Sequence, residues 1–368
     1  MTVAGEVTDA RSHWIADGSR IVTEATIHTQ TGDVVVSQLG GTVEGLTMRT
    51  IPGPDILQAG MQVTVTARYA LDLSLAPHVA VEDVKVSAYP PGFVRTGPTK
   101  SGHYLYWESG CVFITIDAAG TKEIAGDTEF PVIDNVINTW NNATQGCSYL
   151  QILNQGKKDI EVGRDNVNVI KFRDVSWCRP ETQDDPARCH PDSAAGITTA
   201  TYVDDGSSSR DGALVDADVE LNGVGFALAV NGQTLSNASC LSELQNTLTH
   251  EIGHVQGLEH TCLAPGDPSR VDDKGAPVPS CGNATQAQQD ATMYNFQDCG
   301  EVKKETLEPD DINAICAIYP QAKDPGTCEP VAAPGGCCEA NVGRSQGWPA
   351  TMLLGLVVGI LGFWRRRR

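Results

Sequence analysis

Apolar and polar residues alternate along much of the first quarter of the chain. The alternation runs through residues 19–29, 33–39, 62–69 and 79–86, and Gly-Gly and Pro-Gly pairs lie between these segments. A period of two places every second side chain on the same face, which predicts half-buried strands. A Pro/Gly-rich linker follows. We therefore expect a small all-β domain, either a barrel or a sandwich, over residues 1–98.

Helical and strand-like periods mix after the linker. Residues 111–117 alternate like a strand, and residues 167–172, 197–203 and 214–222 are rich in apolar or β-branched side chains. Residues 128–140 instead carry apolar side chains at helical spacing, which is typical of a helix packed on one face. This mixture predicts an α/β (α+β) domain with a mixed, twisted sheet over residues 99–321.

The C-terminal segment has a third pattern. A linker over residues 322–347 contains Gly-Gly-Cys-Cys, residues 348–364 are mostly apolar between two tryptophans, and residues 365–368 are all arginine. Interfacial tryptophans and a terminal basic cluster are typical of a membrane span with a cytoplasmic end. A buried C-terminal helix is the alternative, but four arginines cannot follow it into a core. We expect a single transmembrane segment at residues 348–364.

Charge and cysteine content narrow the possible partners and compartment. The formal net charge of −20 argues against binding to nucleic acid or to anionic lipid surfaces. None of the 12 cysteines precedes Cys111, and the proposed metal chemistry below needs no thiolate, so we expect disulfides and an oxidising compartment. From separation along the chain we expect the pairs Cys111–Cys147 and Cys178–Cys189, and a loop tied between Cys262 and Cys281.

Residues 250–260 read His-Glu-Ile-Gly-His-Val-Gln-Gly-Leu-Glu-His. Positions four apart lie on one face of a helix, so His250 and His254 present their rings to one point. His260 would lie roughly 9 Å further along a continuous helix, so the chain must turn first. Gly257 can make that turn, because glycine enters the left-handed region without steric cost. Three imidazoles leave one position of a tetrahedral zinc ion open for water, as in catalytic sites.

Glu251 follows the first histidine directly, and we interpret it as the general base. A zinc ion lowers the pKa of bound water to about 7, and a neighbouring carboxylate can take the proton and pass it to the leaving amine. The alternative is an amphipathic helix with surface histidines, which explains neither the glycine nor the third histidine.

With these residues the chain resembles the metzincin clan of zinc peptidases, and within it the matrixin-like branch. The sequence Ala291-Thr-Met293-Tyr-Asn resembles the methionine turn beneath the metal, and residues 307–319 resemble the final matrixin helix. The resemblance implies a metzincin catalytic domain with an active-site helix and one catalytic zinc ion. It also implies the site residues: His250, His254 and His260 as ligands, Glu251 as catalytic residue, and Gly257 and Met293 as supporting residues.

Some positions depart from the family pattern. Tyr294 follows the methionine directly, so the tyrosine ligand of astacin-like enzymes is not expected. Asn295 and Phe296 stand where matrixins usually have proline, which leaves undefined the wall of the pocket for the residue after the scissile bond. Residues 214–222 resemble the edge strand of matrixin-like enzymes, whose free backbone would bind a substrate peptide as an added strand.

Three acidic residues on that strand require an interpretation of their own. Asp216, Asp218 and Glu220 share one face of a strand. They could bind a structural Ca2+ ion, but nothing else in the sequence supports calcium, and we interpret them as a solvated strand face.

The order of Gly-Cys, apolar segment and arginine cluster resembles the C-terminal sorting tails of myxobacterial surface proteins. The resemblance implies export and C-terminal sorting machinery as partners and processing at Cys337 or Cys338. We expect an exported protein that is anchored in the cell envelope with the catalytic domain outside; release after processing is the alternative. The start at Met1 lacks the basic-then-apolar pattern of a signal peptide, so we expect the natural start to lie elsewhere.

These patterns together predict a zinc-dependent endopeptidase that hydrolyses peptide bonds of extracellular proteins. Two alternatives remain open: a non-catalytic surface adhesion or binding protein on a metzincin fold, and a zinc amidase acting on cell-wall peptides. Glu251 argues against the first, because a binding protein has no need of a base beside the ligands. The second shares the chemistry and differs in its substrate.

Overall fold

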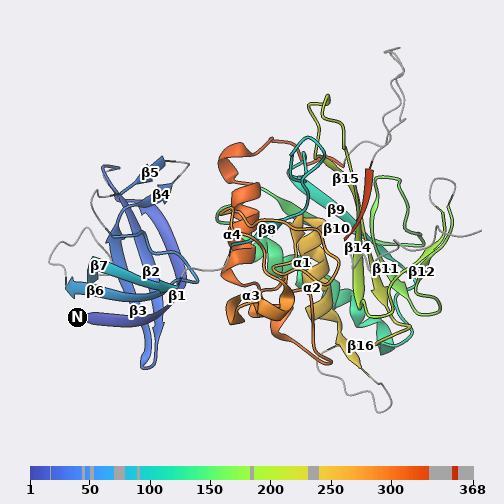
Figure 1. Cartoon of the computed structure of the whole chain (residues 1–368), viewed down its shortest axis with the longest axis horizontal. Coiled ribbons are helices and arrows are strands. Elements are labelled where there is room, and N and C mark those ends of the chain that lie inside the picture. The colour runs from blue at the N-terminus through green and yellow to red at the C-terminus, as the bar shows by residue number, and fades with distance from the viewer. Residues whose placement is uncertain are drawn as a thin grey trace, which may run out of the picture. The chain divides into compact units, whose positions relative to one another are not determined.

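The computed structural model describes residues 1–16, 18–43, 46–49, 54–69, 79–88, 92–182, 186–230, 240–330 and 350–354. The chain divides into two compact units. The first is formed mainly by Met1–Pro91, and the second by Gly92–Leu307 and Asp311–Arg368. Figure 1 shows the chain coloured by residue number, with the strands of the first unit in blue to blue-green.

The first unit is a closed barrel with the strand order β1-β2-β3-β7-β6. Strands β1 and β6 pair and close the barrel, and β3 runs parallel to β7 whereas the other neighbours are antiparallel. A short hairpin of β4 and β5 is attached to it. The strands are β1 (Thr2–Trp14), β2 (Ile21–Thr29), β3 (Gly32–Leu39), β4 (Gly41–Val43), β5 (Leu46–Met48), β6 (Gln62–Tyr69) and β7 (Val79–Ala88).

The barrel core follows from the alternation in the sequence. Val7, Ile27, Val36 and Val65 are fully buried, each from a different strand, while many of their chain neighbours face solvent. Four predicted strands are confirmed here. The sequence did not reveal β1, since polar residues occupy most of Thr2–Trp14 and the strand contributes only Val3 and Val7 to the buried set.

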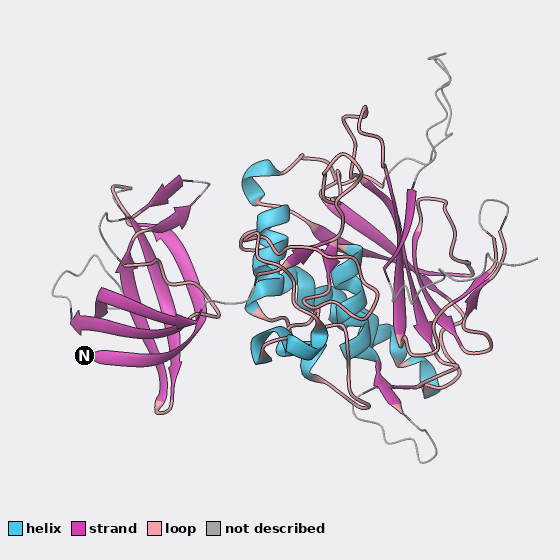
Figure 2. Cartoon of the chain, viewed as in Figure 1, coloured by secondary structure: helices cyan, strands magenta, loops and turns pink. Residues whose placement is uncertain are grey.

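A six-stranded sheet with the order β10-β9-β11-β15-β14-β19 organises the second unit. Strands β10, β9, β11 and β15 are parallel, and β14 and β19 are antiparallel to their neighbours. Figure 2 shows this sheet beside the helices. Its strands are β9 (Cys111–Asp117), β10 (Gln151–Lys158), β11 (Asn168–Arg173), β14 (Gly196–Tyr202), β15 (Leu214–Asn222) and β19 (Ala350–Leu354).

Helices α1 and α2 pack against each other and contribute to one core with this sheet. Trp140 of α1 and Ile252 of α2 are fully buried, together with Ile114 and Ile170 from the strands. The helices are α1 (Glu129–Thr144), α2 (Leu244–Val255), α3 (Gln286–Asp290) and α4 (Pro309–Ile318), with the 3-10 turns η1 (Ala125–Asp127), η2 (Cys281–Asn283), η3 (Lys303–Glu305) and η4 (Gln321–Lys323). Short strands complete the unit: β8 (Val94–Arg95), β12 (Cys178–Arg179), β13 (Arg188–Cys189), β16 (Ala227–Ala229), β17 (Leu241–Glu243) and β18 (Leu258–Glu259).

The predicted fold class, an α/β (α+β) metzincin domain followed by a single transmembrane segment, is wrong. The described chain is mostly β, with a closed barrel and few helices. Helical spacing at residues 128–140 and at His250 and His254 led us to expect helices and strands in similar proportion. Much of the second unit instead forms short strand pairs and loops tied by disulfides.

The C-terminal part of that prediction fails separately. Among the described residues, no helix has both the length and the apolar character needed to cross a membrane. Residues 350–354 of the predicted span form β19, which pairs with β14. A short apolar run can form a strand as well as a helix. Here the edge of the sheet at β14 provides hydrogen-bond partners for its backbone N–H and C=O groups. The remainder of residues 348–364, together with Cys337, Cys338 and residues 365–368, lies outside the described residues.

Five disulfides tie the second unit. The expected pair Cys178–Cys189 and the loop tie Cys262–Cys281 are confirmed, whereas Cys111–Cys147 is wrong. The segment before Cys328 lies beside the start of β9, where Gly110 N donates to Thr327 O at 2.8 Å. The distance between two cysteines along the sequence cannot predict this contact, so the pairing that we expected for Cys111 was wrong. The other pairs are Cys111–Cys328, Cys147–Cys316 and Cys240–Cys299. This number of disulfides indicates an exported or extracellular protein.

The acidic face of β15 is buried, so the expectation of a solvated strand face is wrong. Asp216, Asp218 and Glu220 are at most 2% exposed. Two arginines contact the second and third of them: Arg179 contacts Asp218 at 3.2 Å and Glu220 at 2.9 Å, and Arg173 donates to Glu220 at 2.7 Å. The covering hairpin β12–β13 carries Arg179 and is closed by a disulfide, which the local strand pattern could not reveal.

Candidate metal centre

Helix α2 carries the first two histidines, and its position is fixed at both ends. Glu243 caps its start, where its carboxylate accepts from Asn246 N at 2.8 Å. Two buried tryptophans donate to the helix backbone: Trp140 to Thr249 O at 3.0 Å and Trp107 to Val255 O at 2.7 Å. The helix therefore presents its side chains from a rigid support.

Gly257 makes the turn that the sequence predicted, with φ at +92°. A Cβ at this position would lie 3.2 Å from Leu105 O, so both the backbone conformation and the space favour glycine. The chain then forms β18, which pairs with β8, and Thr96 N donates to Gly257 O at 2.9 Å. This pairing fixes the segment that delivers His260.

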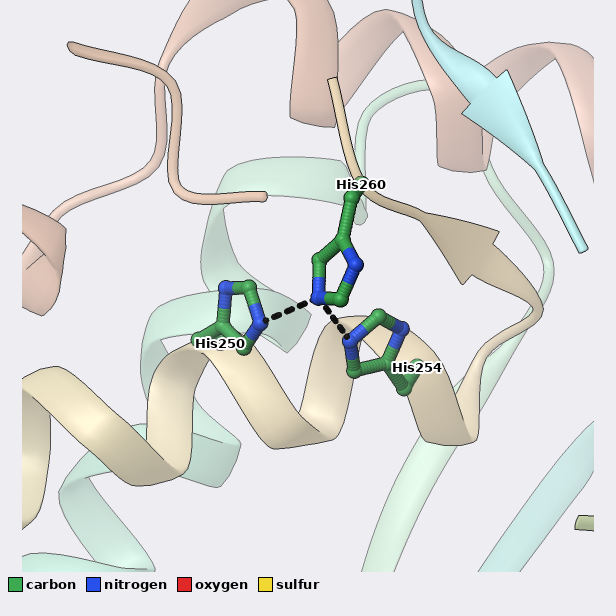
Figure 3. A group of neighbouring side chains, drawn as sticks. All are labelled: His250, His254 and His260. Carbon is green, nitrogen blue, oxygen red and sulfur yellow. Dashed lines mark hydrogen bonds between the residues drawn. The ribbon is translucent and has the colours of Figure 1, made fainter. Parts of the chain in front are cut away.

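The three histidines converge on one point, as Figure 3 shows. His260 Nε2 lies 3.2 Å from His250 Nε2 and 3.1 Å from His254 Nε2. All three are buried, and their ligand atoms lie within 4.8 Å of one another. Two nitrogens that bind a tetrahedral zinc ion at about 2.05 Å would lie about 3.3 Å apart, so this spacing fits the ion.

The hydrogen bonds of the rings support a cation rather than a hydrogen-bonded cluster. His250 Nδ1 lies 2.7 Å from Thr292 O and His254 Nδ1 lies 2.9 Å from Leu258 O, so in neutral rings both Nδ1 atoms donate. Their Nε2 lone pairs then face His260, whose single Nε2 hydrogen could satisfy only one of them. Burial lowers the pKa of His250 and of His260 well below the ordinary value, which keeps these rings neutral. Neutral, oriented imidazoles are what a zinc site requires.

Glu251 lies beside this centre and is 4% exposed. Thr198 Oγ1 of β14 donates to its Oε2 at 2.7 Å. A Cβ on Gly196 would lie 2.8 Å from Glu251 Oε1, so the glycine leaves room for the carboxylate. Burial raises the pKa of Glu251, while the nearby His254 and the hydrogen bond from Thr198 oppose that shift. The carboxylate is thus fixed in place and is a stronger proton acceptor than an exposed one.

Met293 lies beneath the helix, as the methionine-turn motif predicted. It is 2% exposed, and a Cβ added at Gly253 would lie 2.3 Å from its Sδ. Met293 therefore occupies the space that a glycine in the helix leaves free, and its neighbour Thr292 supplies the carbonyl that orients His250. A methionine can fill such an irregular space because its side chain is unbranched.

A cavity of about 150 Å³ opens onto the centre. Residues 193–196 line one part of it, residues 295–297 line another, and Phe226 and Lys304 contribute as well. The prediction that Leu214–Asn222 is an edge strand is wrong, because β15 pairs with β11 on one side and with β14 on the other. The strand nearest to Glu251 is β14, whose outer neighbour is β19.

The sequence did not single out Lys304, although its side chain is only 2% exposed and lines the cavity. Its Nζ donates to Tyr294 O at 2.8 Å and to Phe296 O at 2.9 Å. Burial lowers its pKa to about 8. No local motif marks this lysine, since its neighbour Lys303 has the same side chain and is 36% exposed.

The chain matches no protein-family model, and no curated protein is significantly similar to it.

Proposed function

We propose that the protein is a zinc-dependent endopeptidase. The convergence of three buried imidazole nitrogens beside a buried carboxylate and an open cavity is the observation that carries this proposal. The motif from His250 to His260 and the methionine at Met293 resemble those of metzincin peptidases, which supports the same chemistry. His250, His254 and His260 would hold the metal.

Bound zinc would supply polarisation of the scissile carbonyl and of the attacking water. The protein residues would transfer the proton and orient the ligands. Glu251, held by Thr198, would accept a proton from water and return it to the leaving amine. The hydrogen bonds from His250 and His254 to carbonyl oxygens would keep their Nε2 lone pairs aimed at one point.

Replacement of Glu251 by alanine tests the assignment. The variant should retain about one zinc ion per chain, since the ligands remain, and lose at least about 100-fold in peptide hydrolysis, because the base is gone. The matched control is Glu181→Ala, which removes an exposed carboxylate. Zinc analysis together with cleavage of casein and of a peptide library measures both properties. Wild-type turnover in the Glu251 variant would exclude the assigned role.

The library also distinguishes the alternatives. Cuts within long peptides support an endopeptidase, whereas release of material only from purified cell-wall peptides would indicate an amidase. An adhesion protein would bind zinc and cut neither substrate.

We further propose, from the sequence of the tail alone, that residues 322–368 direct the exported protein to the cell envelope. A chain truncated after Gly336 should then move from the envelope fraction to the medium; the readout is its location and not its activity, because the truncation also removes β19 beside β14. Identical partitioning of the two forms would exclude a sorting role.

A further inference from the structure

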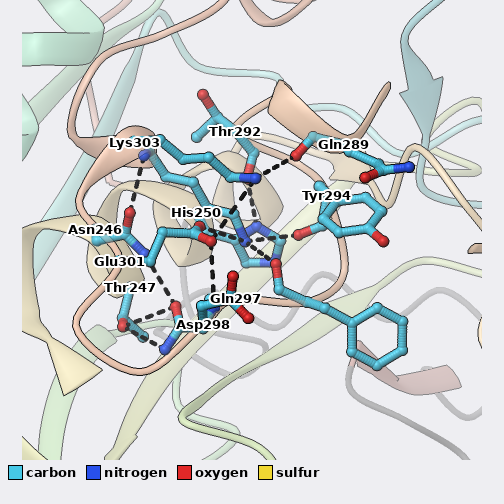
Figure 4. Close-up of polar contacts among 12 residues, drawn as sticks. Asn246, Thr247, His250, Gln289, Thr292, Tyr294, Gln297, Asp298, Glu301 and Lys303 are labelled. Carbon is cyan, nitrogen blue, oxygen red and sulfur yellow. Dashed lines mark hydrogen bonds and ion pairs between the residues drawn. The ribbon is translucent and has the colours of Figure 1, made fainter. Parts of the chain in front are cut away.

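We infer that Lys304 is a positioning residue that holds the carbonyls of Tyr294 and Phe296, thereby fixes the cavity wall formed by residues 295–297, and so sets which substrate side chain the cavity accepts. This inference rests on the proposed peptidase function. It concerns the position where Asn295 and Phe296 replace the usual proline and where the sequence left the wall undefined. Figure 4 shows the polar contacts around this segment.

The wall has little regular structure of its own. Residues 294–297 belong to no helix or strand. Within the described residues, two side chains attach them through hydrogen bonds, besides the backbone bond from Tyr294 N to Ala291 O and the contact of Lys303 Nζ with the Tyr294 ring. One is the ammonium of Lys304, which binds the carbonyls of Tyr294 and Phe296. The other is Gln297, which contacts Asn246 at 3.1 Å.

Both attachments lead to the helix that carries the histidines. Asn246 of α2 accepts from Lys304 N at 2.8 Å through its Oδ1, while its Nδ2 donates to Gln297. Gln297 also contacts Thr247, the next residue of the helix. The wall is thus held at a set distance from His250, and a change in Lys304 would move the wall relative to the centre.

The ammonium of Lys304 forms hydrogen bonds with the wall carbonyls and a longer ion pair with Glu301. Its nearest carboxylate oxygen, Oε1 of Glu301, lies 3.9 Å away, which is beyond hydrogen-bond distance. Burying an ammonium group is unfavourable unless it is hydrogen-bonded. The two wall carbonyls supply these bonds, so the ammonium and the wall stabilise each other.

Outside the metal site and Lys304, the lining has no charged side chain: some of its residues are apolar, and the others (Ser193, Thr247, Asn295 and Gln297) are polar but uncharged. Ala194, Ala195, Phe226 and Phe296 line the cavity. Two hydrogens of the Lys304 ammonium are already bound to carbonyls, which reduces its capacity to hold a substrate carboxylate. We therefore expect leucine to be preferred over alanine and over glutamate after the scissile bond.

The test compares Lys304→Met with Lys303→Met in the full chain. Lys303 is the matched control, because its Nζ also donates to a carbonyl, Gln289 O, but it binds no wall carbonyl, lies outside the cavity lining and approaches only the Tyr294 ring, at 5.5 Å from its centre. The substrates are peptides that differ only in leucine, alanine or glutamate after the cut. In Lys304→Met the leucine-to-alanine ratio of kcat/KM should fall about tenfold, mainly through KM, because a loosened wall fits the larger side chain less well. Zinc content should stay unchanged, and Lys303→Met should keep the wild-type ratio.

Binding provides a readout that does not need hydrolysis. The same peptides, labelled for fluorescence anisotropy, are titrated against Glu251→Ala with and without Lys304→Met, and the ratio of affinities should fall in parallel. If Lys304→Met does not fold, Lys304→Gln takes its place with the same expected result, because it removes the charge and shortens the reach to the wall carbonyls. An unchanged ratio overturns the inference and leaves the peptidase intact. A wild-type preference for glutamate that disappears in Lys304→Met also overturns it, since the lysine would then bind the substrate directly. A wild-type protein that neither binds nor cuts any of the peptides overturns the proposed function as well.

Discussion

The barrel and the second unit bury different kinds of groups. In the barrel the buried side chains are apolar, apart from Thr23, Ser37 and Gln38, and its described residues include no buried carboxylate or ammonium. The second unit buries acidic residues, arginines, Lys304 and three histidines, and five disulfides tie it. Alternation of side chains on closed strands is enough to define the first core. The second unit holds charged groups away from water, and this requires cross-links and networks of hydrogen bonds.

The largest expected change in stability comes from removing the disulfide between Cys111 and Cys328, and this variant tests the contrast between the two units. This disulfide closes a loop of 217 residues, whereas Cys178–Cys189 closes one of 11. Because Cys147–Cys316 lies inside the long loop and shortens it to about 50 residues in the unfolded chain, a chain-entropy estimate gives about 4 kcal/mol of stabilisation for Cys111–Cys328 and about 3 kcal/mol for Cys178–Cys189. The paired serine variants should lose stability in that order, as measured by chemical denaturation. Hydrogen exchange should show loss of protection in the second unit and unchanged protection in residues 1–91. Equal losses for the two variants would contradict the entropic account.

A smaller effect is expected from the barrel core. Ile27 is fully buried, so Ile27→Ala should cost about 2–5 kcal/mol. The control is Val35→Ala, since Val35 is 42% exposed and its truncation should change stability by less than about 0.5 kcal/mol. Hydrogen exchange should place the loss of protection within residues 1–91, while peptide hydrolysis should stay at the wild-type rate. A drop in hydrolysis would show that the two units depend on each other.

The same contrast explains what the sequence could predict. A period of two identified four barrel strands, and the spacing of His250, His254 and His260 with Gly257 between them predicted their convergence, because both follow from local backbone geometry. Strand β1 was missed, since its thirteen residues bring only two apolar side chains into the buried set.

Local sequence patterns did not predict contacts between segments that lie far apart along the chain. The partner of Cys111 lies at the end of a returning segment, and Arg179 reaches Asp218 from a separate hairpin. Lys304 follows His260 by many residues and acts on carbonyl oxygens, which have no signature in the sequence. Such groups become visible only when the fold places them together.

The smallest predicted effect concerns one buried carboxyl group, Asp216. Its Oδ1 has no hydrogen-bond partner among the residues that the structure describes, and burial together with the nearby Asp218 raises its pKa well above the ordinary value. The folded protein therefore keeps a proton that the unfolded chain loses at a pKa of about 3.9. The resulting stabilisation is complete below that pH and is lost as the pH rises toward the folded-state pKa.

Asp216→Asn keeps the shape of this side chain and removes its titration. The wild type should lose stability relative to the variant between pH 5 and pH 7, by at most about 1.4 kcal/mol per pH unit. Urea denaturation of both proteins at several pH values measures this difference. The control is Asp159→Asn, which changes an exposed carboxylate and should follow the wild-type profile. Parallel pH profiles for the wild type and Asp216→Asn would mean that Asp216 is ionised in the folded protein. The second unit would then hold this charge as firmly as it holds those paired with its arginines.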